Sequence, residues 1–187
     1  MVEPFVDFIN TRVQISLEIA SEIQTLLQIE EFPKGHLLIK EGMIAHRLYF
    51  IVNGSARTYY FHDGKDVTSW IYKEDQLITS WSSFFGRQAS FESVQILEDS
   101  KVCSLTYDHL QDLYFRYPKI QEFGRLIVEE QLVFLDQFYK GFLFSTAKEK
   151  YDLLLSVFPD VTSRVNLGHI ASLLGITQET LSRIRRN

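Results

Sequence analysis

The chain has 187 residues, of which 45% are hydrophobic and 23% charged, a balance typical of an ordered globular protein. The single cysteine, Cys103, excludes an internal disulfide, an iron–sulfur cluster held by several cysteines and a multi-cysteine zinc site. The sequence has no apolar run of about 20 residues that could span a bilayer and no signal peptide at its start, so we expect a cytoplasmic protein with no membrane partner. The net charge is −5, but residues 1–144 carry 13 Lys and Arg against 20 Asp and Glu, whereas residues 145–187 carry 6 against 4. This asymmetry would direct a polyanion to the C-terminal end.

The first 107 residues predict one helix followed by short strands. Residues 5–29 have the apolar period of a helix. Seven strands are then expected, at 36–40, 48–52, 56–60, 67–72, 77–80, 93–97 and 101–106. Asn53-Gly54 and Asp63-Gly64 favour two-residue hairpin turns, so each pair is expected to join neighbouring strands. Short strands at intervals of about ten residues predict an antiparallel sandwich or barrel.

Helices are predicted for the rest of the chain. A short helix over 108–117 precedes Pro118, a long helix covers 119–144, and another covers 147–158. The long helix has a broad apolar arc, of which one side consists of Ile120, Phe123, Ile127, Phe134 and Phe138. The adjoining side consists of Val128, Leu132, Leu135 and Tyr139.

The long helix can cover the β domain with only one of these sides, so the other side requires a partner. A second copy of the same helix in a two-fold dimer is the simplest partner. We assign the dimer interface to the side that begins at Ile120 and ends at Phe138. A helix buried wholly within one chain is the alternative.

The segment 166–187 has the spacing of a helix-turn-helix. Small Ala171 allows a close approach of two helices, Gly175 supplies a tight turn, Thr177 is a suitable N-cap, and Leu181 would face inward. The positions that remain outward are Gln178, Glu179, Ser182, Arg183, Arg185 and Arg186. A DNA recognition helix needs this layout, with polar residues that reach base edges and arginines for guanines and phosphates. The residues therefore predict double-stranded DNA as a partner.

This segment and four motifs in the front half resemble the Crp–Fnr family of bacterial transcription regulators. The motifs are Phe32-Pro-Lys-Gly35, Lys40-Glu-Gly42, Leu48-Tyr-Phe-Ile-Val-Asn-Gly54 and Leu97-Glu-Asp99. The stretch Ile-Thr-Gln-Glu-Thr-Leu-Ser-Arg-Ile-Arg at 176–185 is similar to regulators from Bacteroidetes.

The resemblance implies an α+β fold in three parts. Residues 1–118 would form a cyclic-nucleotide-binding-like sensor domain, an antiparallel double-stranded, jelly-roll-like β-roll with flanking helices. Residues 119–144 would form the dimerisation helix, and residues 145–187 a winged helix-turn-helix. The implied function is that of a homodimeric, sequence-specific DNA-binding transcription regulator, with RNA polymerase as a further partner.

The resemblance also implies which residues contact DNA. The expected set is Thr177, Gln178, Glu179, Thr180, Ser182, Arg183, Arg185 and Arg186. Within it, Gln178, Glu179 and Arg183 lie where the family reads bases, and the threonine and serine hydroxyls lie where it contacts phosphates.

The effector site departs from the cyclic-nucleotide-binding members of the family. Where those have a Gly-Glu pair for the ribose and an Arg-Ser pair for the phosphate, this chain has Thr79-Ser80 and Ser90-Phe91. A buried phosphate without a paired cation is costly, and Arg87 lies three residues early, so cyclic AMP is not expected as the effector. The residues that take the place of this site are Trp70, Ser80, Trp81, Ser82, Ser90 and Phe91. They would suit an apolar or aromatic small-molecule effector, or a filled pocket that binds nothing; no cofactor is identified.

Neither an enzyme nor a metal site is expected. The sequence has no His-x-His pair, no His-Glu-x-x-His, no Gly-x-Ser-x-Gly and no glycine-rich phosphate loop. His36, His46, His62 and His109 are scattered, and Cys103 is expected in a strand as a small core residue. The remaining alternative is an interaction or sensor module of the same fold that no longer binds DNA specifically.

Overall fold

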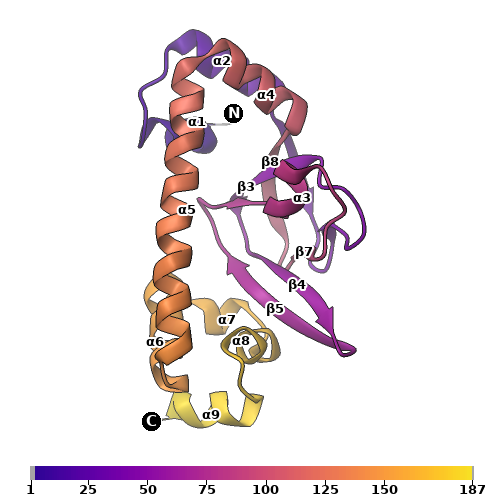
Figure 1. Cartoon of the computed structure of the whole chain (residues 1–187), viewed down its shortest axis with the longest axis vertical. Coiled ribbons are helices and arrows are strands. Elements are labelled where there is room, and N and C mark those ends of the chain that lie inside the picture. The colour runs from indigo at the N-terminus through magenta and orange to yellow at the C-terminus, as the bar shows by residue number, and fades with distance from the viewer. Residues whose placement is uncertain (1–2, 187) are drawn as a thin grey trace.

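The computed structural model describes residues 3–186 (Figure 1). Residues 1, 2 and 187, at the outer bounds of the first and last expected domains, lie outside the described residues. The strands are β1 (Gln28–Phe32), β2 (Leu37–Ile39), β3 (Arg47–Asn53), β4 (Ala56–His62), β5 (Lys65–Tyr72), β6 (Leu77–Ile78), β7 (Ser93–Ile96) and β8 (Ser100–Thr106). The helices are α1 (Glu3–Asn10), α2 (Leu17–Leu26), α3 (Trp81–Gly86), α4 (Tyr107–Arg116), α5 (Pro118–Phe144), α6 (Ala147–Val157), α7 (Val161–Arg164), α8 (Leu167–Leu174) and α9 (Gln178–Arg186). All seven expected strands are confirmed, as are the three helices expected after residue 107.

The eight strands form two four-stranded antiparallel sheets, in the orders β1-β8-β3-β6 and β2-β7-β4-β5. Asp63-Gly64 is confirmed as the hairpin turn between β4 and β5, and both residues have positive φ, 49° and 73°, as a type I′ turn requires. The hairpin expected at Asn53-Gly54 is wrong, because β3 and β4 lie in different sheets. Gly54 instead turns the chain from one sheet to the other, at φ 106°.

The single helix expected over 5–29 is also wrong, because the segment forms α1, α2 and β1. The side chain of Asn10 accepts a hydrogen bond from the Ile15 N–H at 3.2 Å, and the hydroxyl of Ser16 accepts one from the Ile19 N–H at 3.3 Å. These polar side chains bind backbone N–H groups that a continuous helix would bond to its own carbonyls. β1 then pairs with β8 at the edge of its sheet.

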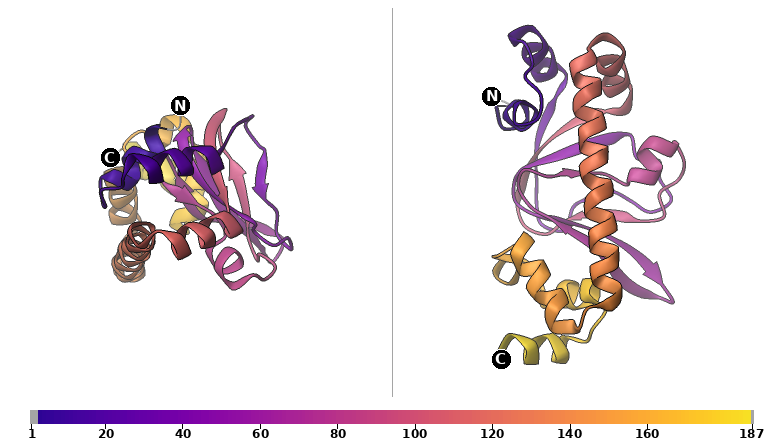
Figure 2. Two further views of the ribbon diagram at one scale, coloured as in Figure 1. Left: turned by 90° about the horizontal axis from the view of Figure 1, so that it is seen from above. Right: turned by 60° about the vertical axis from the view of Figure 1, so that its left-hand side comes forward.

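α5 extends along the β domain, with α1 and α2 beside its first turns and α6 to α9 beside its last (Figures 1 and 2). Its inner side packs into the main core, in which the Phe5 and Phe50 rings lie 5.3 Å apart and the Phe5 and Phe123 rings 6.4 Å apart. α5 is therefore both a wall of the β domain and the connection to the C-terminal helices.

This packing corrects the expected dimer interface, which was placed at Ile120, Phe123, Ile127, Phe134 and Phe138. Ile120, Phe123 and Ile127 are buried in the core of their own chain. The rings of Phe134 and Phe138 lie 5.0 and 4.8 Å from Trp70. The adjoining side is exposed instead, with Val128 (52%), Leu132 (66%), Leu135 (58%) and Tyr139 (66%). Both sides are apolar, so the helical period alone could not say which of them the β domain covers.

The C-terminal helices form a second core. Phe158, Ile170 and Leu181 pack there together with Ile71 of β5 and Leu97, which follows β7. All strands of the described chain precede residue 107, so residues 145–186 contain no β-hairpin wing, and the winged form of the expected fold is wrong for this part. No helix among residues 3–186 is both long and apolar enough to cross a membrane.

Candidate functional site

α8 and α9 meet at a left-handed turn. Gly175 has φ 67°, and the Ile176 N–H donates to the Ala171 carbonyl at 3.0 Å, which closes the turn in the way that a glycine after a helix favours. Thr177 Oγ1 accepts a hydrogen bond from the Thr180 N–H at 3.2 Å. The expected turn and the expected N-cap are both confirmed.

One side of α9 is buried and the rest faces solvent. Leu181 is fully buried in the second core, and Ile184 is half-buried beside it. The expected DNA-binding residues comprise exposed Thr177, Gln178, Glu179, Arg183, Arg185 and Arg186 and half-buried Thr180 and Ser182. They therefore lie together on one short helix and its cap, at the opposite end of the molecule from α1 (Figure 1).

The two ends of α9 differ in charge. Hydrogen bonds from the Glu179 N–H and the Thr177 hydroxyl lower the pKa of the Glu179 carboxyl, so it is ionised at neutral pH. Arg183, Arg185 and Arg186 occupy the last turn, where the helix dipole stabilises cations. The surface thus offers an anionic acceptor at one end and several donors at the other.

Arg164 of α7 connects this end of the chain to the β domain. Its guanidinium lies 2.7 Å from Glu74, 2.6 Å from Glu98 and 5.1 Å from the Phe158 ring centre. Burial alone would raise the pKa of Glu74, but hydrogen bonds from Arg164 and from the Gly54 N–H outweigh it, and the pKa is lowered. Glu74 therefore holds a full negative charge against Arg164 at neutral pH.

α8 is attached directly to the edge strand of the second sheet. The Thr68 N–H of β5 donates to Ser172 Oγ at 3.0 Å, and this hydroxyl lies 3.3 Å from the Asp66 carbonyl. The side chain of one helix thus occupies backbone groups that an edge strand leaves unpaired. The position of α9 is consequently fixed by contacts to β5 as well as by the turn at Gly175.

We expect Arg164→Ala to lower the free energy of unfolding by about 2–3 kcal/mol, because two carboxylates are left without their cation. The loss should be largest near neutral pH. It should shrink as the pH falls through the lowered pKa of Glu74, because a protonated Glu74 no longer needs the cation. Urea unfolding of the unaltered protein and the variant at several pH values measures this loss of unfolding free energy. Lys148→Ala, which removes an exposed pair with Asp152, is the matched control and should cost at most about 0.5 kcal/mol; equal losses for both variants would contradict a structural role for Arg164.

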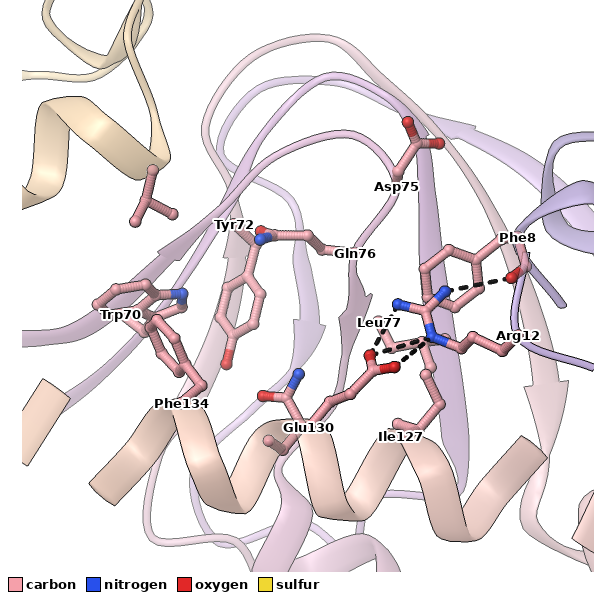
Figure 3. A pocket seen from close by; sticks show the side chains of 12 residues that line it. Phe8, Arg12, Trp70, Tyr72, Asp75, Gln76, Leu77, Ile127, Glu130 and Phe134 are labelled. Atoms are coloured by element: carbon pink, nitrogen blue, oxygen red, sulfur yellow. Dashed lines mark hydrogen bonds and ion pairs between the residues drawn. The ribbon is translucent and has the colours of Figure 1, made fainter. Parts of the chain in front are cut away.

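Two adjoining cavities lie where α5 passes the β domain, and four residues line both: Trp70, Tyr72, Gln131 and Phe134. The first, here the α1-side cavity, has a volume of about 330 Å³ and is drawn in Figure 3. Its rim carries the ion pair between Arg12 and Glu130, whose closest atoms are 2.8 Å apart. Arg12 also donates to the Phe8 carbonyl at 3.2 Å.

The second, here the α3-side cavity, also has a volume of about 330 Å³. Ser69 of β5, Trp81 and Phe85 of α3, and Phe138 of α5 line it in addition to the shared residues. The exposed side of α5 supplies the remaining wall, with Val128, Leu132 and Leu135. Two expected effector residues, Trp70 and Trp81, line this cavity, whereas Trp70 is the one that also lines the α1-side cavity.

The other expected effector residues do not line the α3-side cavity. Ser80 and Ser90 are buried, with their hydroxyl oxygens 2.8 Å apart. Ser82 and Phe91 are exposed and are not among the residues that line this cavity, so their place in an effector site stays a prediction.

Arg87 does not replace the missing phosphate-binding arginine. Its guanidinium donates to the Ala45 carbonyl at 3.1 Å, lies 3.2 Å from His46 Nδ1 and stacks over the Tyr107 ring at 4.4 Å. Arg87 lines neither of the two cavities.

Sequence reasoning missed Glu92, which is only 9% exposed. Burial raises the pKa of the Glu92 carboxyl, and hydrogen bonds from Ser69 and Ser80 offset this in part. A signal was present in the sequence, because Glu92 directly precedes β7 and lies two residues from Val94 and four from Ile96, which are both buried. Residues at this spacing point to one side of an extended chain.

Among residues 3–186 no group of three or more His, Cys, Asp or Glu side chains is placed to hold a metal ion. Cys103 is buried in β8, and burial raises the pKa of its thiol to about 12. The thiol is therefore protonated and acts as a small core side chain, as expected.

Comparison with known proteins identifies relatives for most of the chain. The family model of the cyclic nucleotide-binding domain matches residues 29–117. The fumarate and nitrate reduction regulatory protein of Vibrio cholerae is 29% identical over 186 residues, which cover 88% of this chain and 71% of that protein.

Solved structures show the same fold at lower identity. FixK2 from Bradyrhizobium japonicum superposes with a TM-score of 0.73 at 15% identity, covering 86% of this chain and 83% of that one. The c-di-GMP responsive global regulator CLP of Xanthomonas campestris superposes with a TM-score of 0.68 at 14% identity, covering 91% and 90%. At these identities the structural likeness establishes the fold alone.

Proposed function

We propose that this chain is a member of the Crp–Fnr family of transcription regulators, as its similarity to the cyclic nucleotide-binding domain and to the Vibrio cholerae regulator supports. We propose further that it acts as a homodimer that binds a specific DNA sequence through α9. The observation that carries the proposal is the exposed side of α9. It combines an ionised Glu179 with Gln178 and three arginines on a helix whose opposite side is buried.

The exposed side chains have the chemistry of the major groove. The Gln178 amide can pair with adenine, the Glu179 carboxylate can accept from the cytosine amino group, and Arg183 can donate to guanine. Thr177, Thr180 and Ser182 carry hydroxyls that would contact phosphates, and Arg185 and Arg186 would add positive charge at the backbone. The negative charge of residues 1–144 would keep DNA away from the rest of the molecule.

The proposed dimer forms through the exposed apolar side of α5. Packing Val128, Leu132, Leu135 and Tyr139 against the same residues of a second copy would bury a surface that is otherwise more than half exposed at each position. Two α9 helices related by a two-fold axis would read half-sites about 34 Å apart. In this arrangement residues 1–118 form the sensor, 119–144 the dimerisation helix and 145–187 the DNA-binding unit.

The experiment that tests the function is selection of bound sequences from a random duplex library with purified protein at moderate salt. A two-fold symmetric motif with half-sites one helical turn apart supports the proposal. Salt-sensitive binding without a motif would mean that α9 does not read bases, and no binding at low salt would favour the interaction-module alternative.

We expect Arg183→Ala to weaken binding to the selected sequence by about 1–3 kcal/mol and to relax the base preference at one position of each half-site. Fluorescence anisotropy on the selected duplex and on single-base variants measures both effects. Lys119→Ala is the matched control, because Lys119 is exposed in the first turn of α5, away from the proposed dimer face, and pairs with Glu122 at 2.8 Å. An unchanged affinity for Arg183→Ala would argue against base reading by α9.

A further inference from the structure

Aromatic rings dominate the wall of the α3-side cavity. The rings are Trp70, Tyr72, Trp81, Phe85, Phe134 and Phe138. Trp70 lies 4.8 Å from Phe138 and 5.0 Å from Phe134, and Trp81 lies 6.1 Å from Phe85, measured between ring centres. The faces of such rings attract cations, and several rings around one space form the cages that bind ammonium groups.

A buried carboxylate lies directly behind this wall. Ser69 lines the cavity, and its hydroxyl oxygen is 3.3 Å from Glu92 Oε2 and 2.8 Å from Thr58 Oγ1. Tyr72, another lining residue, is close enough for the Glu92 charge to raise its pKa, after the larger effect of burial. Glu92 therefore lies behind Ser69, and apart from Ser69 and Gln131 the lining of the cavity consists of aromatic and aliphatic residues.

Within residues 3–186 no lysine, arginine or histidine forms an ion pair with Glu92. The lining of the α3-side cavity contains no charged residue, and Arg87 is engaged elsewhere. A buried carboxylate with only hydroxyl partners is costly. A cation that entered the cavity would remove that cost, whereas a phosphate would add a second negative charge beside the first.

We propose that the α3-side cavity binds a small molecule with an aromatic or alkyl body and a cationic amine head, with the head between the aromatic rings and Glu92. The cavity volume of about 330 Å³ suits a small ligand. Val128, Leu132 and Leu135 line the cavity and also belong to the proposed dimer face. The ligand would therefore bias the packing of two α5 helices, a consequence that rests on the proposed function.

The protein carries its own probe for this site, because it has two tryptophans and both line the cavity. We would titrate the purified protein with 2-phenylethylammonium, 3-phenylpropanoate and 2-phenylethanol, and follow tryptophan fluorescence. The ammonium compound should saturate with an affinity at least about tenfold higher than that of the carboxylate. Equal or tighter binding of the carboxylate, or no saturable response to the ammonium compound, would overturn the proposal.

Glu92→Gln should abolish the preference for the ammonium compound and leave the response to 2-phenylethanol unchanged. Glu130→Gln is the matched control, since Glu130 lines the α1-side cavity, and it should keep the preference for the ammonium compound.

If Glu92→Gln fails to fold, Phe85→Leu is tested in its place. Phe85 is 41% exposed, so the fold should tolerate its replacement, and its ring is part of the cavity wall. This variant should weaken binding of the ammonium compound more than that of 2-phenylethanol, and equal weakening would contradict the aromatic cage.

These titrations require no DNA, so they fail or succeed independently of the proposed function. A protein that selects a DNA motif but does not discriminate between the three probes overturns the ligand proposal alone. A protein that prefers the ammonium compound but binds no DNA overturns the regulator function alone.

Discussion

Gly54→Ala should lower the free energy of unfolding by about 4 kcal/mol, because it combines backbone strain with a steric clash. Gly54 has φ 106°, a conformation that residues with a Cβ rarely adopt. An added Cβ would lie 2.0 Å from Ser100 Oγ and 2.9 Å from Ser100 Cα. The backbone atom cannot move aside as a side chain could, so β8 or the crossing between the two sheets must shift.

The matched control for this prediction is Gly35→Ala. Gly35 also has positive φ, 89°, but an added Cβ would meet no atom within 4 Å, so only the strain of about 1–2 kcal/mol remains. Urea unfolding monitored by circular dichroism compares the two variants. Replacing Ser100 by glycine in the Gly54→Ala background should recover part of the loss. Equal losses of unfolding free energy for Gly54→Ala and Gly35→Ala would show that the close approach to Ser100 does not contribute to the loss.

Gly54 also links the β domain to the C-terminal helices. Its N–H donates to Glu74 Oε1 at 2.7 Å, and Glu74 holds Arg164 of α7. A displaced Gly54 would therefore weaken the contact that positions α8 and α9. We infer that the turn between the sheets contributes to the orientation of the proposed DNA-binding surface as well as to stability.

The sequence predicted the positions of the strands and helices better than it predicted which strands pair with one another. Strand positions and the helix after Pro118 follow from local period and turn residues, and these are confirmed. The role of Asn53-Gly54 could not be predicted, because an Asn-Gly pair can form a hairpin turn or a crossing between sheets. The pairing of β3 with distant β8 decides between the two. β1 was missed for a related reason, since its pairing with β8 is fixed by residues 68 to 76 positions away.

The part of the candidate site formed by α8 and α9 could be predicted, because its contacts join residues that are close in sequence. The turn at Gly175, the cap at Thr177 and buried Leu181 follow from sequence spacing within one short segment. The cavity could not be predicted in the same way, because its walls come from β5, α3 and α5, which are far apart in sequence. Glu92 was overlooked, since its charge favours the surface unless the strand alternation of its neighbours is followed.

Changing both Leu132 and Leu135 to glutamate should convert the proposed dimer into a monomer. The two side chains are 66% and 58% exposed in the single chain, so the substitutions leave the main core intact, and the circular dichroism spectrum of the folded chain should be unchanged. In the proposed dimer four carboxylates would meet at a dry interface without partners. Sedimentation velocity should therefore show monomers at concentrations where the unaltered protein is dimeric.

Val133→Glu is the matched control, because Val133 is 56% exposed and lies about 100° around α5 from Leu132. This variant should remain a dimer and bind DNA normally. The Leu132 and Leu135 variant should lose affinity for a two-fold symmetric operator by about 100-fold or more, since the two half-sites are no longer bound by one molecule. Its affinity for an isolated half-site should be unchanged, because α9 and the contacts of Arg164 and Ser172 are untouched. A variant that stays dimeric would place the interface elsewhere, and a monomeric variant that keeps full operator affinity would show that one α9 suffices for recognition.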